Sequence, residues 1–128
     1  MLSLIEIFVI IIIHWFADFV LQTDKQAKGK SKNWSDLLSH TLSYSLIWLG
    51  VSFILILAQS SNVHEIIKFT LLFTIITFIC HTITDYFTSR LNSKLLAKGD
   101  THNFFVSVGF NQVLHYIQLF LTYYLLKS

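Results

Sequence analysis

The sequence predicts an all-α integral membrane protein, a bundle of four transmembrane helices built as two similar helical hairpins. Of its 128 residues, 54% are hydrophobic and only 12% are charged, about half the charged fraction of an ordinary soluble domain. The mean hydropathy of +0.62 agrees with a membrane location. Four apolar segments also have the length of roughly 20 residues that a helix needs to cross a bilayer. Residues 1–128 are therefore expected to form a single transmembrane domain.

The four predicted spans cover residues 2–22, 37–58, 66–88 and 104–126. They are expected to be helices because backbone polar groups inside a bilayer must be satisfied within the segment itself. The first span has no basic region before it and no cleavage pattern of small residues after it. We therefore expect it to be a retained helix rather than a signal peptide.

The charges of the connections predict which way the bundle faces. Seven of the nine basic residues lie in the connections TDKQAKGKSKNWSD and SRLNSKLLAKGDTHN, whereas QSSNVHE contains neither lysine nor arginine. Positive charge prefers the cytoplasmic side of a membrane. We therefore expect both basic loops in the cytoplasm and both termini outside, with the protein in the inner (plasma) membrane of the cell.

Polar residues recur four positions apart in or beside every span, a spacing that places both members of a pair on one helix face. The pairs are His14 and Asp18, Asp36 and His40, His81 and Asp85, and Asn111 and His115. The histidine comes first in the pairs of the first and third spans and second in those of the second and fourth. The first and third spans run from the outside to the inside, and the second and fourth run back. The reversal predicts four histidines in one layer, with the carboxylates about 5.4 Å nearer the cytoplasm. Two related hairpins of this kind occur in membrane proteins with a central site.

These polar residues are candidates for a metal site inside the bundle. An ionisable side chain at the bilayer centre costs roughly 2.5–3.5 kcal/mol and is a functional candidate by default. Imidazole and carboxylate groups bind divalent transition metals such as zinc, manganese or iron. The predicted ligands are His14, His40, His81, His115, Asp18 and Asp85.

The same pattern predicts further roles around that site. Asp18 and Asp85 are also the candidate catalytic groups. Neighbouring polar side chains are expected to orient the ligands through hydrogen bonds, namely Gln22, Asp36, Asn111 and Gln112. The alternative is that the histidines and aspartates only form hydrogen bonds between helices.

The segments HWFADFVLQTDKQAKGK, LLSH, CHTITDY and NQVLHY resemble the family of small integral membrane proteins known as DUF3307. The resemblance spans nearly the whole chain, and the motif with His14, Asp18, Leu21, Gln22 and Thr23 is its most specific part. That family resembles, more distantly, membrane-bound proteins described as metal-dependent hydrolases. Where the family usually has Asp-Gln-x-x-His, this chain has Asn111, and so lacks one carboxylate that could be a ligand or a base. The family's activity is not established, so the resemblance predicts architecture more than a reaction.

Three functions fit these residues. The first is a metal-dependent hydrolase of a lipid or phosphate ester, because a bound metal ion lowers the pKa of water to about 7. The second is a small proton- or ion-coupled transporter or channel, since Thr70, Thr74 and Thr77 extend the polar face of the third span. Helix packing is the alternative explanation for these threonines. The third is a non-catalytic membrane adaptor or oligomeric scaffold, whose basic first connection would contact anionic lipid.

Composition also limits which kinds of partner the protein is expected to bind. The net charge of +2 and the lack of a basic stripe argue against nucleic acid. One cysteine, Cys80, permits neither a disulfide nor a cysteine-based zinc site within a single chain. Membrane lipid is the expected partner, and a homo-oligomer is also expected because four short helices bury little surface in one protomer.

Overall fold

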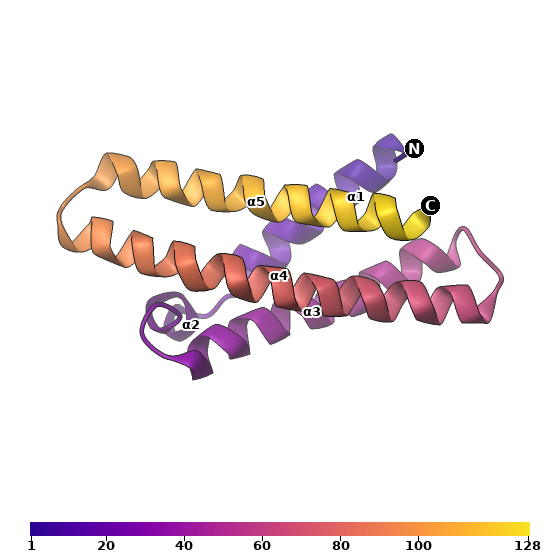
Figure 1. Ribbon diagram of the computed structural model, residues 1–128, viewed down its shortest axis with the longest axis horizontal. Coiled ribbons are helices and arrows are strands. Elements are labelled where there is room, and N and C mark those ends of the chain that lie inside the picture. Colours follow the sequence, from indigo (N-terminus) through magenta and orange to yellow (C-terminus); the bar gives the residue numbers. More distant parts are fainter.

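The computed structural model describes residues 1–128 and consists of helices joined by short turns (Figure 1). In chain order the elements are α1 (Leu4–Trp15), the π-helical segment η1 (Phe16–Val20), α2 (Asp24–Gly29), α3 (Trp34–Leu57), α4 (Val63–Ala97) and α5 (Thr101–Lys127). The predicted all-α class is confirmed.

Three of these helices, α3, α4 and α5, are long and apolar enough to cross a membrane. The first predicted span is less regular than expected, because 12 residues of α-helix are followed by five of π-helix. The two basic connections are more helical than expected. A short helix, α2, forms within residues 23–36, and α4 continues to Ala97 through a segment predicted to be a loop.

Local sequence explains where these helices begin and end. Ser3 and Glu6 form a capping box at the start of α1, and Thr23 and Gln26 form another at the start of α2. The segment LNSKLLA contains no glycine or proline, so nothing in it stops α4. The chain turns at Gly99, whose φ of 72° is a left-handed conformation that favours glycine after a helix.

Helix α4 is the centre of the bundle and packs on α3 on one side and on α5 on the other. Figure 1 shows α4 antiparallel to both neighbours, with α1 crossing them at an angle. Both termini lie at the same end of the molecule as the α3–α4 turn, whereas α2 and the α4–α5 turn lie at the opposite end (Figure 1). The segments that carry most of the lysines therefore share one end of the bundle.

The interior of the bundle is rich in polar groups, and its surface is largely apolar. Trp48 and Phe73 are fully buried in the hydrophobic core, but His14 and His81 are buried just as completely. Large apolar side chains point outwards along all the long helices, and Ile79, for example, is 50% exposed. This distribution is expected where lipid surrounds the helices, and it is consistent with a multi-pass membrane protein.

The carboxylate of Glu6 joins α1 to the end of α5. Its Oε1 atom accepts hydrogen bonds from the Tyr123 hydroxyl at 2.6 Å, from Lys127 Nζ at 2.8 Å and from Gln59 Nε2 at 3.0 Å. Because α1 otherwise contacts α5 only along a short stretch, this network holds the first helix in place.

Replacing Glu6 by alanine is expected to lower the free energy of unfolding by roughly 1–3 kcal/mol, because the buried Tyr123 hydroxyl loses its acceptor. The measurement is thermal unfolding of the purified protein in detergent. Glu65→Ala is the control, since that carboxylate is exposed and bonds only to Ser60. Equal losses of stability in the two variants would contradict the assigned role of Glu6.

Candidate metal centre

A π-helical turn brings Asp18 to the place where η1, α3 and α4 meet. In this turn the Leu21 N–H donates to the Phe16 carbonyl 3.1 Å away, one residue further back than in an α-helix. Asp18 is only 4% exposed although it lies near the end of the first helical segment. Turns of this kind are frequent at functional sites, and this one places a carboxylate inside the bundle.

Four buried side chains converge there: Asp18 from η1, His40 from α3, and His81 and Asp85 from α4. Their ligand atoms all lie within 4.8 Å of one another. Nε2 of His40 is 3.1 Å from Asp18 Oδ1, 3.3 Å from Asp85 Oδ2 and 3.3 Å from Nε2 of His81. Nε2 of His81 is 3.4 Å from Asp18 Oδ1 and 3.6 Å from Asp85 Oδ2. We call these four residues the His/Asp cluster.

Five of the six spacings within the His/Asp cluster are compatible with ligands of one metal ion. Bonds of about 2.0–2.1 Å to a tetrahedral ion place the ligand atoms about 3.3–3.4 Å apart. The five separations given above lie between 3.1 and 3.6 Å. Nδ1 of His81 is buried without a hydrogen-bond partner, so every polar contact of this side chain is made at the cluster. The cluster can therefore hold a metal ion between two nitrogen and two oxygen atoms.

Asp85 has further partners outside the His/Asp cluster. Its Oδ1 accepts a hydrogen bond from Asn111 Nδ2 at 3.0 Å and lies 3.1 Å from Nε2 of His115. Its Oδ2 forms an ion pair of 2.9 Å with Nζ of Lys30, which follows α2. Asp18 has one such partner, Gln112, whose Nε2 donates to Oδ2 over 3.3 Å. These contacts hold both carboxylates in place and bring one positive charge to the edge of the cluster.

His14 and His115 lie beside the His/Asp cluster rather than within it. Nδ1 of His14 is 2.8 Å from the Tyr44 hydroxyl, and its Nε2 is 2.7 Å from Gln112 Oε1. The nearest distance from His14 to Asp18 is longer, at 3.7 Å.

The four histidines predicted to share a layer form a row of adjacent rings. Ring centroids are 5.4 Å apart from His14 to His115, 4.1 Å from His115 to His81 and 5.3 Å from His81 to His40. All six predicted ligands are thus brought together, and the structure arranges four of them around one centre.

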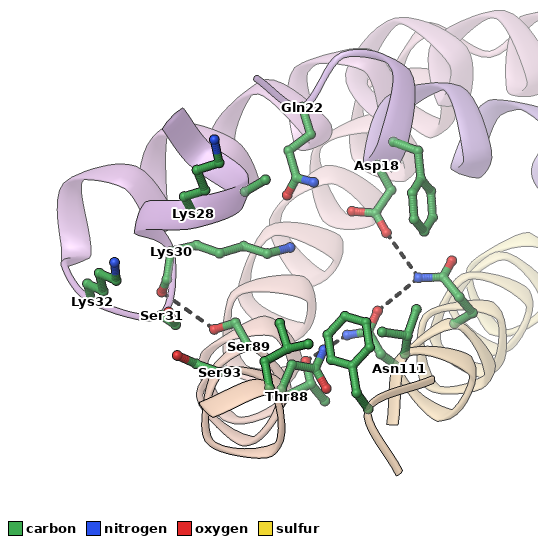
Figure 2. A pocket seen from close by; sticks show the side chains of 17 residues that line it. Asp18, Gln22, Lys28, Lys30, Ser31, Lys32, Thr88, Ser89, Ser93 and Asn111 are labelled. Carbon is green, nitrogen blue, oxygen red and sulfur yellow. Dashed lines mark hydrogen bonds between the residues drawn. The ribbon is translucent and has the colours of Figure 1, made fainter. Parts of the chain in front are cut away.

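A pocket of about 390 Å³ lies between the basic end of the bundle and the cluster. Figure 2 shows the Lys30 side chain extended across this pocket, with Lys28 and Lys32 further from Asp18. Asp18 is the one acidic residue among those that line it. The pocket therefore gives solvent or a polar ligand a route to the cluster.

Of the residues predicted to orient the ligands, all but one lie at the cluster or at its pocket. Asn111 and Gln112 contact the cluster carboxylates, and Gln22 lines the pocket with its Oε1 atom unpaired. Asp36 lies elsewhere, in the first turn of α3, where its Oδ2 accepts from Asn33 Nδ2 at 2.8 Å. Its carboxylate packs so closely on Gly29 that any side chain at position 29 would overlap it. Asp36 thus fastens α3 to α2 and makes no contact with the cluster.

Two residues of the site were not singled out from the sequence. Tyr44 bonds to His14, and its ring stacks on that of His81 with centroids 3.8 Å apart. Its position four residues after His40 places it on the same helix face and could have indicated it. No comparable pattern indicated Lys30. It lies in a predicted cytoplasmic loop, and the preference of such loops for positive charge already explained it.

The threonines of α4 are involved in packing. Thr77 is fully buried and accepts a hydrogen bond from Gln118 Nε2 at 3.2 Å. The Thr74 hydroxyl donates to the Thr70 carbonyl one turn earlier, at 2.8 Å. These contacts give the hydroxyls of Thr74 and Thr77 partners within the bundle, in agreement with the packing explanation, whereas the buried Thr70 hydroxyl has no hydrogen-bond partner.

Comparison with known proteins places the chain in a family without assigning it an activity. The model of the family described as Protein of unknown function (DUF3307) matches residues 7–128, which include the whole His/Asp cluster. No curated protein and no solved structure matches the chain.

Proposed function

The chain belongs to the DUF3307 family, and we propose that this member is a metal-dependent hydrolase embedded in the membrane. The observation that carries the proposal is the convergence of ligand atoms from Asp18, His40, His81 and Asp85 within 4.8 Å of one another inside the bundle. Two carboxylates would balance the charge of a divalent ion, so the loaded site would be close to neutral in its buried surroundings. Zinc, manganese and iron all suit this set of nitrogen and oxygen ligands.

We propose that three of the four residues hold the ion and that Asp85 acts beside it as a base, while Asp18 is the carboxylate that lines the pocket. Asp18 Oδ1, His40 Nε2 and His81 Nε2 lie 3.1–3.4 Å apart, and three protein ligands with one open position are typical of catalytic zinc sites. Asp85 is the more distant oxygen from His81, and its Oδ2 atom is shared with Lys30. We assign Asp85 the role of base at the open position.

The reaction supported best is hydrolysis of a lipid or phosphate ester. A divalent ion held there would supply a nucleophile from water at neutral pH and polarise the phosphoryl or carbonyl oxygen of the substrate. The oxygen of water bonds to phosphorus or to the acyl carbon, the ester bond breaks, and the leaving oxygen takes up a proton. Asp85 would accept the proton of water and return it to that oxygen. Lys30 extends across the pocket from which substrate would enter.

The proposal includes an orientation in the membrane. We propose that α1 and η1 together form a short fourth span, because roughly 17 helical residues are the minimum for crossing. The end of the bundle with α2 and the α4–α5 turn would face the cytoplasm, in agreement with the basic residues of these segments. The pocket would then open to the cytoplasm, with the protein in the inner membrane.

Metal content is the direct test of the site. Protein purified without chelator is expected to contain about one transition metal ion per chain, and the double variant His40→Ala/His81→Ala is expected to contain none, because both nitrogen ligands are removed. The measurement is elemental analysis of the purified protein. The matched control is His64→Ala/His102→Ala, since both of those histidines are exposed and lie outside the cluster. Folded protein without metal, or equal metal in both double variants, would contradict the proposal.

A further inference from the structure

The pocket beside the His/Asp cluster has the chemistry of an anion site. Lys28, Lys30 and Lys32 line it, and Asp18, its one acidic residue, would be offset by a bound metal ion. Hydroxyl groups of Ser89 and other serines and threonines add neutral hydrogen-bond donors. A compact ammonium group such as that of Lys30 is a common phosphate ligand. A phosphate group could accept hydrogen bonds from several of these donors at once.

An apolar groove lies on the outer surface between α4 and α5. Its apolar lining residues are Ile83, Phe87, Leu91, Phe110 and Leu114. Phe87 and Phe110 are 67% and 58% exposed, and both belong to helices long and apolar enough to cross a membrane. In a bilayer this groove would be filled by an acyl chain, because lipid is the surrounding solvent.

Thr88 lines both the pocket and the groove. The Thr88 hydroxyl accepts a hydrogen bond from Asn111, which in turn donates to Asp85 of the cluster. The buried hydroxyl of Ser107 also lines the groove and has no hydrogen-bond partner. It is a free donor that could bond to an ester oxygen of a lipid in the groove.

Because the pocket and the groove share a lining residue, we propose that the protein binds a lipid carrying a phosphate monoester, with the phosphate in the pocket and one acyl chain in the α4–α5 groove. The proposal names the substrate class and rests on the proposed function only for the step that follows binding. Lys30 forms an ion pair with Asp85. When the phosphate binds, Lys30 exchanges this partner for a phosphate oxygen, which releases Asp85 of the cluster from the ion pair.

The test uses light-activated labelling, which requires binding but no turnover. Full-length protein in phosphatidylcholine vesicles receives phosphatidic acid with a photoreactive group in its acyl chain, and labelled residues are located by mass spectrometry. Labels are expected on residues 83–91 and 107–114. Unlabelled phosphatidic acid should compete, whereas phosphatidylcholine and glycerol 3-phosphate should not. Competition by glycerol 3-phosphate as strong as by phosphatidic acid would mean that a soluble phosphate is the ligand, and would overturn the lipid assignment.

The Lys30→Gln variant tests the phosphate contact. It is expected to lower labelling of the groove about tenfold, the effect of losing one charge-assisted hydrogen bond. Lys30→Arg, which keeps the charge, should restore most of the labelling and also shows that loss of folding is not the cause. Lys68→Gln, in an exposed lysine near the opposite end of α4, is the matched control. Unchanged labelling in Lys30→Gln, or labels spread equally over the outer face of α3, would overturn the proposal.

Labelling and hydrolysis separate the two proposals. A specifically labelled groove in a metal-free, inactive protein would support the lipid site and reject the hydrolase. Hydrolysis of soluble esters by protein whose groove is not specifically labelled would support the hydrolase and reject the lipid site.

Discussion

Replacing Asp85 by asparagine is expected to lower the rate of ester hydrolysis by about 100-fold or more, the usual contribution of a general base. Asparagine has nearly the same shape and keeps one oxygen for the hydrogen bond from Asn111, so the change removes mainly the negative charge. The measurement is kcat for a chromogenic phosphate or acyl ester, with the protein loaded with metal beforehand. Metal content is measured on the same samples.

Asp18→Asn is the informative comparison, because Asp18 is assigned to hold the ion. Its effect should fall first on metal content, whereas the effect of Asp85→Asn should fall first on the rate. Asp24→Asn is the matched control, since that side chain is exposed at the start of α2. A normal rate in Asp85→Asn with metal bound would show that Asp85 is not the base. Loss of metal in Asp85→Asn but not in Asp18→Asn would mean that Asp85 holds the ion and Asp18 is the base.

Removing the metal is expected to lower the melting temperature of the protein by roughly 10 °C or more. A ligand present at about 1,000 times its dissociation constant stabilises the folded state by about 4 kcal/mol, and each kcal/mol moves the melting temperature of a chain of this size by several degrees. Without the ion, the carboxylates of Asp18 and Asp85 share one buried site and are compensated mainly by Lys30. The measurement is thermal unfolding in detergent with and without a chelator.

The variant His40→Ala/His81→Ala separates this effect from other actions of the chelator. It should melt at the same temperature with and without chelator, because it has no ion to lose. A wild-type melting temperature that is insensitive to the chelator would indicate that the His/Asp cluster is a hydrogen-bonded packing element.

Prediction of the fold from sequence succeeded where the signal was long and continuous. The segments that became α3, α4 and α5 each contain an apolar window of 18 residues, and a helix satisfies the backbone polar groups of such a segment within the segment itself. The irregular end of the first span was missed, because the π-helical turn at Phe16–Val20 leaves no pattern in hydropathy. The extension of α4 to Ala97 was missed for the opposite reason. Its residues favour a helix, but their polarity indicated a loop.

The residues of the candidate site could be predicted from the sequence, but the contacts between them could not. A charged group inside a bilayer is costly, so His81 and Asp85 in the third span were expected to face the interior of the bundle. Asp36 follows the same four-residue spacing, yet it bonds to Asn33 near Gly29. Lys30, interpreted as a determinant of topology, instead reaches Asp85 across 55 positions of the chain.

The sequence by itself determined that the chain is helical and apolar on its outside, and which helix faces carry the histidines and aspartates. These properties follow from the composition of each segment and from the periodicity of a helix about its own axis. Only the tertiary structure decided that Asp18, His40, His81 and Asp85 share one centre, that His14 and His115 stand beside it, and that Lys30 returns to it. Helical periodicity specifies a direction around one axis, but the rotation and offset between neighbouring axes depend on the packing of all side chains at once.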